Sequence, residues 1–278
     1  MKKSLLIITL LAAICSGLFA GPDYPFEVKK SGKGQKSLIF IPGYGCSGAV
    51  WDETRAQFEK DYTCYVLTMP GFAGVKPEEN PDIFRWVSSI SAYIRENHIS
   101  KPVLIGHSLG GTIAQWVASD YPSLVSGIVV VDALPCLSAL SNPGFKALPE
   151  PDCTKFRTGF LSLPPASFEQ MQKTAIASMV TDTSRIAVIV DWSMKSDRNT
   201  QALIYCQLLN TDLRDTIKAV HCPALILLEP GFKSMKSQIT DQYSKLGGAN
   251  LHYGNNGLHF IMYDDKSWFF QELKTFLH

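Results

Sequence analysis

The stretch Gly106-His107-Ser108-Leu109-Gly110 decides the fold of this chain, because it fits the pattern G-x-S-x-G. Three apolar residues precede the stretch and a helix-like run follows it. Strand, sharp turn and helix form the context in which this pattern makes a nucleophile elbow, a strained turn that exposes a serine hydroxyl. Such a turn needs small neighbours, and the two glycines supply them. The motif therefore predicts a nucleophilic Ser108, with a glycine-serine loop that carries no chemistry as the alternative.

A serine hydroxyl is a weak nucleophile at neutral pH, so the chain must also supply a histidine base and a carboxylate that orients it. His107 lies inside the elbow, and we expect its side chain to point away from that of the serine. His259 lies in the turn-rich segment 255–260, just before an amphipathic helix expected at 266–277. Four further histidines occupy helix-end, pre-strand, strand-like and terminal positions: His98, His221, His252 and His278. The sequence therefore predicts His259 as the base, and a half-buried loop histidine is the alternative.

Apolar runs alternate with helix-like runs over the first half of the chain. Strands are expected at 37–41, 64–68, 103–105 and 127–131, and helices at 50–59, 84–96 and from the elbow to 120. This alternation predicts a parallel sheet with helices on both faces, and the apolar runs without polar alternation indicate strands that are buried on both sides. Active sites in such sheets lie at the carboxyl ends of the strands.

The pattern changes between residues 133 and 212, where proline-rich turns are mixed with helical segments at 168–179 and 200–209. We interpret this stretch as a helical cap inserted into a catalytic core that comprises residues 21–132 and 213–278. Several large apolar residues of the cap are candidates for an acyl or aromatic pocket, or for ordinary core positions: Phe160, Met171, Met179, Trp192 and Met194.

From about Phe26 to its C-terminus, the chain resembles the α/β-hydrolase superfamily. The elbow, extended by Gly111, resembles that superfamily's G-H-S-x-G-G motif, and segments 69–74 and 257–264 resemble two of its loops. The resemblance implies an α/β-hydrolase fold, with a mostly parallel central sheet flanked by helices on both faces and a helical cap insertion after the sixth strand. It also implies that the serine, the acid and the histidine follow one another in that order.

The resemblance further implies an oxyanion hole made of two backbone N–H groups, one from the residue after the nucleophile and one from the loop after an early strand. Leu109 supplies the first of these. The family usually carries His-Gly-x-Gly in the loop, where this chain has Pro42-Gly43-Tyr44-Gly45, so Tyr44 is the expected second donor. Proline in place of the histidine leaves the Tyr44 amide intact but removes a side chain that often braces this loop.

The position of the acid departs from the family's usual pattern. Alignment of the seventh strand, residues 224–228, places Phe232 where the aspartate is expected. Some members carry the acid at the end of the sixth strand instead, and Asp132 occupies that position here. We therefore expect Asp132 to be the acid. Asp197 and Glu229 remain open as alternatives, although Asp197 also suits a helix N-cap and Glu229 requires a shifted loop.

Together these features predict a secreted or periplasmic serine hydrolase that cleaves a small or medium carboxylic ester or lactone through an acyl-enzyme. Ser108 would attack, His259 would transfer the proton, and Asp132 would orient the imidazole. Neither a cofactor nor a metal is expected. A carbon–carbon bond hydrolase, an amidase and a cofactor-free perhydrolase would use the same triad. A ligand-binding protein of this fold with little turnover is the alternative from another class.

The N-terminus resembles a secretory signal peptide, residues 1–20, with two lysines ahead of an apolar run and a cleavage point after Ala20. The run is too short for a transmembrane helix, so no stable membrane anchor is expected after cleavage. Cys15 raises the alternative of a lipoprotein, which the bulky Ile14 before it disfavours. The expected location is therefore secreted or periplasmic.

The charge content of the chain narrows the class of partner that it can bind. The 278 residues include 26 basic and 25 acidic side chains without a long basic run, which argues against nucleic acid as a partner.

Six cysteines remain after the signal peptide: Cys46, Cys64, Cys136, Cys153, Cys206 and Cys222. An oxidising compartment permits disulfides between them, and the sequence does not choose among the pairings. A bond between Cys136 and Cys153, at the start of the cap, is one expectation. No spacing resembles a zinc site.

Overall fold

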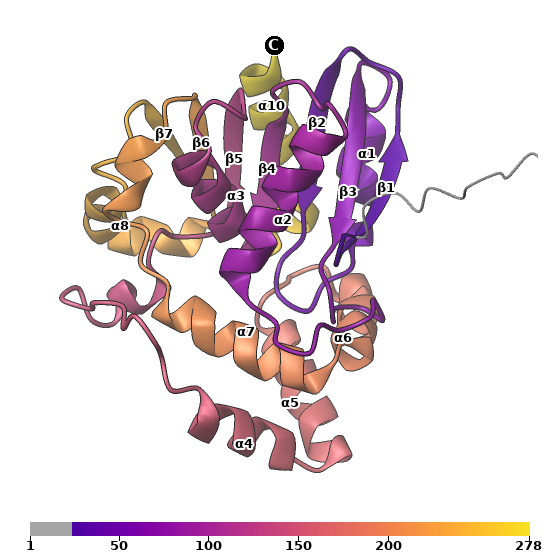
Figure 1. Cartoon of the computed structure of the whole chain (residues 1–278), viewed down its shortest axis with the longest axis vertical. Helices are drawn as coiled ribbons and strands as arrows, with labels where there is room; N and C mark the ends of the chain where they lie inside the picture. Colours follow the sequence, from indigo (N-terminus) through magenta and orange to yellow (C-terminus); the bar gives the residue numbers. More distant parts are fainter. Residues whose placement is uncertain (1–23) are drawn as a thin grey trace, which may run out of the picture.

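The computed structural model describes residues 24–278, so the expected signal peptide and Cys15 lie outside the described residues. Seven strands form one sheet in the order β1-β3-β2-β4-β5-β6-β7 (Figure 1). Only the β1–β3 pair is antiparallel in this sheet. The strands are β1 (Glu27–Ser31), β2 (Lys36–Ile41), β3 (Tyr62–Thr68), β4 (Val103–His107), β5 (Gly127–Val131), β6 (Ala224–Leu228) and β7 (Ala249–Tyr253). The predicted mostly parallel sheet is confirmed, and the strand that the resemblance counts as sixth is β5.

Helices cover both faces of the sheet, as predicted (Figure 1). Residues of α2, α3 and α8 pack in the hydrophobic cluster on one face, and residues of α1 and α10 pack in the cluster on the other. The helices are α1 (Asp52–Phe58), α2 (Ile83–Glu96), α3 (Leu109–Asp120), α4 (Thr154–Ser162), α5 (Pro165–Ala177), α6 (Ile186–Lys195), α7 (Arg198–Asn210), α8 (Lys236–Gln242), α9 (Ile261–Asp264) and α10 (Lys266–Leu277). Short 3-10 helices are η1 (Gly48–Trp51), η2 (Leu137–Leu140), η3 (Thr183–Arg185), η4 (Thr216–Ala219) and η5 (Pro230–Met235). Within residues 24–278, none of the helices combines the length and the apolar character that a membrane span requires.

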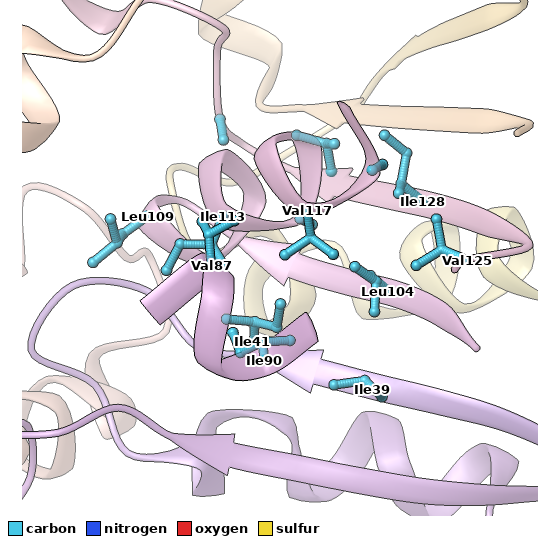
Figure 2. Close-up of a cluster of buried hydrophobic side chains, with 14 of the residues drawn as sticks. Ile39, Ile41, Val87, Ile90, Leu104, Leu109, Ile113, Val117, Val125 and Ile128 are labelled. Carbon is cyan, nitrogen blue, oxygen red and sulfur yellow. The ribbon is translucent and has the colours of Figure 1, made fainter. Parts of the chain in front are cut away.

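Strand β2 explains why the sheet is buried on both faces. Successive side chains of a strand point to opposite faces. Ile39 and Ile41 accordingly belong to one hydrophobic cluster, and Leu38 and Phe40 belong to the other. Figure 2 shows the first cluster, in which side chains of α2 and α3 lie over Ile39, Ile41 and their neighbours on β4 and β5. All four of these β2 side chains are inaccessible to solvent, so an uninterrupted apolar run is what this position in the sheet requires.

Helices α4 to α7 form the insertion that follows β5, which confirms the predicted helical cap (Figure 1). The boundaries 133 and 212 remain a prediction, since the helices themselves begin at Thr154 and end at Asn210. Helix α4 contains no buried residue and lies against α7. Helix α4 is therefore an outer layer of the cap that packs mainly on α7.

One disulfide joins Cys153, at the start of α4, to Cys206 in α7. The expected bond between Cys136 and Cys153 is therefore wrong. Cys136 lies at the base of the insertion, where its backbone N–H donates to Oε1 of Gln242 at 3.1 Å, whereas Cys153 lies at the start of α4. The thiol of Cys136 is free and buried, like those of the remaining cysteines that the structure describes: Cys46, Cys64 and Cys222.

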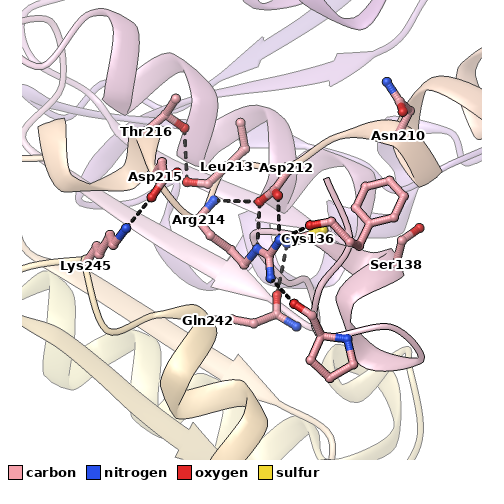
Figure 3. A network of polar contacts seen from close by, with 12 residues as sticks. Cys136, Ser138, Asn210, Asp212, Leu213, Arg214, Asp215, Thr216, Gln242 and Lys245 are labelled. Carbon is pink, nitrogen blue, oxygen red and sulfur yellow. Dashed lines mark hydrogen bonds and ion pairs between the residues drawn. The ribbon is translucent and has the colours of Figure 1, made fainter. Parts of the chain in front are cut away.

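Arg214 braces the loop that leads from the core into the cap (Figure 3). Its guanidinium donates to the carbonyl oxygens of Pro143 and Phe145 at 2.9 and 2.5 Å. Its Nε donates to Oδ1 of Asp212 at 2.8 Å, and hydrogen bonding to Asp212 raises the pKa of the guanidinium still further. A planar guanidinium suits this use, because several N–H groups are fixed in one orientation. The network therefore ties the loop at the start of the insertion, residues 143–145, to Asp212 and Arg214 at its end.

Candidate active site

The G-x-S-x-G stretch forms the sharp turn between β4 and α3. Ser108 has φ +52° and ψ −121°, a conformation that residues with a side chain rarely adopt. A Cβ atom on Gly106 would lie 2.1 Å from the carbonyl oxygen of Gly110, and one on Gly110 would lie 2.2 Å from that of Ile41. No side chain fits at either glycine. The steric requirement that the sequence indicated is therefore present in the fold.

The backbone of Ser108 is held by both neighbouring elements. Its N–H donates to the carbonyl oxygen of Val131, the last residue of β5, at 2.8 Å. Its own carbonyl oxygen accepts from Gly111 and Thr112 at 2.8 and 3.1 Å, in the first turn of α3. The serine is therefore fixed next to the end of β5, and Asp132 is the next residue along that strand.

Asp132 lies at the carboxyl end of β5 with its side chain almost completely buried. Its Oδ2 lies 2.6 Å from Nδ1 of His259, and its Oδ1 accepts from the N–H of Glu229 at 2.7 Å. The residue has φ +50°, which is strained for a residue with a side chain. An ionised carboxylate is tolerated in a buried position when both oxygens have partners, and here they do.

The two alternative acids have other contacts. Oδ1 of Asp197 accepts from the N–H and the hydroxyl of Thr200 at 2.7 and 2.8 Å, so Asp197 caps the N-terminus of α7. Glu229 contributes its backbone N–H to Asp132 rather than its carboxylate to His259. Burial, and next the charge of Asp132, raise the pKa of the Glu229 carboxyl. Of the three carboxylates, the structure brings only Asp132 into hydrogen-bonding contact with His259.

His107 contacts the loop that carries His259, which the sequence did not predict. Nε2 of His107 lies 2.9 Å from the carbonyl oxygen of His259, and the two rings are 4.6 Å apart. Because a carbonyl only accepts, Nε2 must carry the proton. Complete burial, and next the proximity of His259, hold the pKa of His107 well below its usual value, so the ring is neutral. In the sequence, only the position of His107 inside the elbow could have pointed to this contact.

The loop after β2 forms a tight turn beside the elbow. The N–H of Cys46 donates to the carbonyl oxygen of Gly43 at 3.2 Å, and Gly45 has φ +66°, which favours glycine. We call residues 43–46 the oxyanion turn. A Cβ atom on Gly43 would lie 3.3 Å from Cβ of Ser108, so the turn adjoins the nucleophile candidate. The ring of Tyr44 packs against those of Phe72 and Tyr205, both at 5.4 Å.

The two amides expected to bind an oxyanion are both unoccupied within the described part of the chain. Leu109 is the first residue of α3, where a backbone N–H has no intrahelical acceptor. Neither its N–H nor that of Tyr44 donates a hydrogen bond to another described residue. Free, preorganised N–H groups beside a nucleophile are the arrangement that stabilises a tetrahedral intermediate of acyl transfer.

The large apolar residues of the cap divide between two environments. Met171 and Met179 are each 38% exposed, whereas Trp192 and Met194 pack against the hydrophobic cluster that contains α10. Phe160 packs edge-on against Phe168 within the cap at 5.2 Å.

Among residues 24–278, no group of three or more histidine, cysteine or acidic side chains is arranged to bind a metal ion.

Residues 38–265 match the family described as "Alpha/beta hydrolase family". The chain is similar to the pimeloyl-[acyl-carrier protein] methyl ester esterase of Salmonella newport, with 26% identity over 70% of this chain and 75% of that protein. It is 29% identical to the enzyme of the same name from Vibrio parahaemolyticus over 37% of this chain, a match that spans only 38% of that relative's length. Among solved structures, the enol-lactonase from Burkholderia xenovorans is similar in fold, with a TM-score of 0.73 and 13% identity over 91% of this chain and 96% of that one.

Proposed function

We propose that this chain, which belongs to the alpha/beta hydrolase family, is a serine hydrolase that cleaves a small or medium carboxylic ester or lactone through an acyl-enzyme. Ser108 is the nucleophile, His259 the base, and Asp132 the carboxylate that orients it. The amides of Tyr44 and Leu109 form the oxyanion hole. The names of the similar proteins, methyl ester esterases and an enol-lactonase, support esters and lactones as the substrate class.

The hydrogen bond between His259 Nδ1 and Asp132 Oδ2 carries this proposal. With Nδ1 engaged by a buried carboxylate, Nε2 is the ring nitrogen left to accept a proton, and the carboxylate stabilises the imidazolium that forms. The strained turn at Ser108 and the two free amides beside it support the same chemistry. Backbone strain of this kind is concentrated at functional sites.

The chemical course follows from these roles. Oγ of Ser108 bonds to the carbonyl carbon of the substrate while its proton passes to Nε2 of His259. The negative charge that develops on the carbonyl oxygen is bound by the amides of Tyr44 and Leu109. The ester C–O bond then breaks, and the leaving alcohol takes the proton from His259. Water adds to the acyl-enzyme by the same route, and the acid and the free serine are released.

We further propose that the protein is secreted or periplasmic. The N-terminal segment has the signal-peptide pattern described above, and the Cys153–Cys206 disulfide suits an oxidising compartment. N-terminal sequencing of the protein expressed with its full leader and recovered outside the cytoplasm tests this proposal. A mature chain that begins near Gly21 is expected, and an intact Met1 would contradict it.

The test of the catalytic proposal is Ser108→Ala, assayed with p-nitrophenyl acetate and butyrate. We expect a loss of at least about 10³-fold in kcat/KM, because covalent catalysis disappears while substrate binding remains. The matched control is Ser234→Ala, which removes an exposed hydroxyl bonded only to the carbonyl of Gly231. A fluorophosphonate probe should label Ser108 in the native protein and not after denaturation. Full activity of Ser108→Ala would overturn the proposal, and absence of both turnover and labelling would favour a ligand-binding protein.

A further inference from the structure

The corner between α6 and α7 reaches down from the cap onto the core. We call residues 193–201 the cap corner; they include the last residues of α6 and the first turn of α7. The cap corner contacts two core loops, the oxyanion turn after β2 and the loop of residues 69–75 after β3. Parallel strands present their carboxyl ends at one edge of the sheet, so the two loops are neighbours.

The hydroxyl of Ser196 links the two loops. Its Oγ accepts from the backbone N–H of Ala73 at 2.9 Å and lies 3.4 Å from the carbonyl oxygen of Gly45, in the oxyanion turn. It also lies 2.8 Å from the carbonyl oxygen of Trp192, which is the better placed of the two acceptors, so the contact with Gly45 is the weaker one. The residue is 5% exposed, and water therefore cannot easily replace these contacts.

Close packing accompanies the hydrogen bonds. A Cβ atom on Gly45 would lie 3.7 Å from Oγ of Ser193, so the oxyanion turn rests directly on the cap corner. On the other loop, the N–H of Asp197 donates to the carbonyl oxygen of Gly71 at 2.7 Å. A Cβ atom on Gly71 would lie 2.5 Å from Oγ1 of Thr200, which leaves room for glycine only. Both loops are therefore fitted to the cap corner.

Gln201 holds the cap corner itself in shape. Its side chain is completely buried, and its Nε2 donates to the carbonyl oxygens of Ser193 and Ser196 at 3.1 and 3.2 Å. Its Oε1 lies 3.4 Å from Oγ of Ser193, whose hydroxyl also lies 2.9 Å from Oε1 of Gln172. A buried polar side chain with its hydrogen bonds made to backbone carbonyls specifies one geometry, since any other leaves polar groups unpaired.

We propose that Ser196 and Gln201 are positioning residues of the reaction, which hold the oxyanion turn so that the Tyr44 N–H meets the charge that develops on the substrate. This inference rests on the proposed function. A donor stabilises the transition state only when it is already in place, so a small displacement of the turn lowers the rate of the chemical step more than it weakens substrate binding. Neither residue touches the substrate; both act through the backbone of residues 43–46.

The test compares Ser196→Ala, Ser196→Thr and Gln201→Glu with the wild-type protein in ester hydrolysis. Ser196→Ala should lower kcat about 5- to 50-fold, less than the loss of a whole oxyanion donor, while KM changes less than about twofold. Ser196→Thr retains the hydroxyl and should recover most of kcat. Gln201→Glu removes the two N–H donors in a similar volume and should also lower kcat selectively. The matched control is Ser178→Ala, which removes a cap hydroxyl bonded to the carbonyl of Ala175, away from the oxyanion turn.

A boronic acid inhibitor gives the second readout, because its tetrahedral adduct occupies the oxyanion hole whereas the substrate ground state does not. Its affinity should fall in proportion to kcat/KM in Ser196→Ala and Gln201→Glu. A rise in KM with unchanged kcat would overturn the inference. Wild-type kinetics in folded Ser196→Ala and folded Gln201→Glu would also overturn it. Absence of turnover in the wild-type protein, or full activity of Ser108→Ala, would instead overturn the proposed function, so the two failures are distinguishable.

Discussion

Asp132 and His259 are 127 positions apart in the chain, yet a carboxylate oxygen of one lies 2.6 Å from Nδ1 of the other. The contact joins the end of β5 to the loop after β7, two strands away across the sheet. It is also isolated from water on the carboxylate side, where the Asp132 side chain is 1% exposed. The carboxylate is instead held by the His259 ring and by the N–H of Glu229, so its orientation toward Nδ1 is fixed.

Replacement of that carboxylate tests its role directly. Asp132→Asn should lower kcat about 10³- to 10⁴-fold, because the amide neither stabilises an imidazolium nor selects the same tautomer of His259. Steady-state hydrolysis of p-nitrophenyl butyrate measures the effect. Glu229→Gln is the matched control and should change kcat less than about threefold. A larger loss in Glu229→Gln than in Asp132→Asn would assign the acid to Glu229.

Strain at the nucleophile has a cost in stability that a glycine should remove. With φ +52° and ψ −121°, position 108 suits glycine, whereas alanine retains the strain of the serine. Ser108→Gly should therefore unfold with a free energy about 1 kcal/mol higher than that of Ser108→Ala, and both should be inactive. Urea denaturation followed by circular dichroism measures the difference. A Ser108→Gly variant less stable than Ser108→Ala would argue against strain at this turn.

The buried His107 should make the folded protein sensitive to acid. An imidazole in the unfolded chain takes up a proton below about pH 6.5, whereas burial lowers the pKa of His107 in the folded protein well below that value. Between the two values the unfolded state binds more protons, so stability falls as the pH falls. The Tm of the wild type should therefore drop between pH 7.5 and 5, and that of His107→Gln, which retains an N–H donor, should drop less. The exposed His221→Gln is the control and should behave like the wild type.

The Cys153–Cys206 disulfide should stabilise the protein by restricting the unfolded cap. The bond closes a segment with a sequence separation of 53, for which the loss of chain entropy corresponds to about 4 kcal/mol. Cys153→Ser/Cys206→Ser should therefore lower the free energy of unfolding by up to that amount, as measured with guanidinium chloride. A single Cys136→Ser substitution controls for the loss of a thiol without the loss of a bond. Equal stability of the double variant and the wild type would mean that α4 detaches before the core unfolds.

The elements with a strong periodic pattern were predictable from the sequence. The helix expected at 266–277 is α10 (Lys266–Leu277), and the helix expected at 84–96 is α2 (Ile83–Glu96). Several elements were not expected, among them β1 (Glu27–Ser31) and α8 (Lys236–Gln242). β1 is an exposed antiparallel edge strand whose central residues include two lysines, so it lacks the apolar run that marks the buried strands. Its pairing with β3, not its own composition, makes it a strand.

Part of the candidate site was also predictable from the sequence, and part was not. Ser108 and His259 could be nominated from local motifs, because each lies in a turn with a distinctive sequence. The sequence favoured Asp132 as the acid but left Asp197 and Glu229 open, since the outcome depends on which carboxylate the sheet order places beside the His259 loop. The pairing of Cys153 with Cys206 likewise depends on α4 folding over α7. The role of His107 as a donor to the carbonyl of His259 also arises only in three dimensions.

The cap corner limits how this enzyme scaffold can be re-engineered. Exchange of the segment from α4 to α7 for the equivalent segment of a relative would look like a simple route to new substrate selectivity, since the proposed triad lies wholly outside it. The transplanted segment would nevertheless have to bring its own hydroxyl to Ala73 and Gly45. Chimeras designed without that graft should keep their fold and their acyl-accepting serine while turning over slowly, which makes the corner the first place to repair in them.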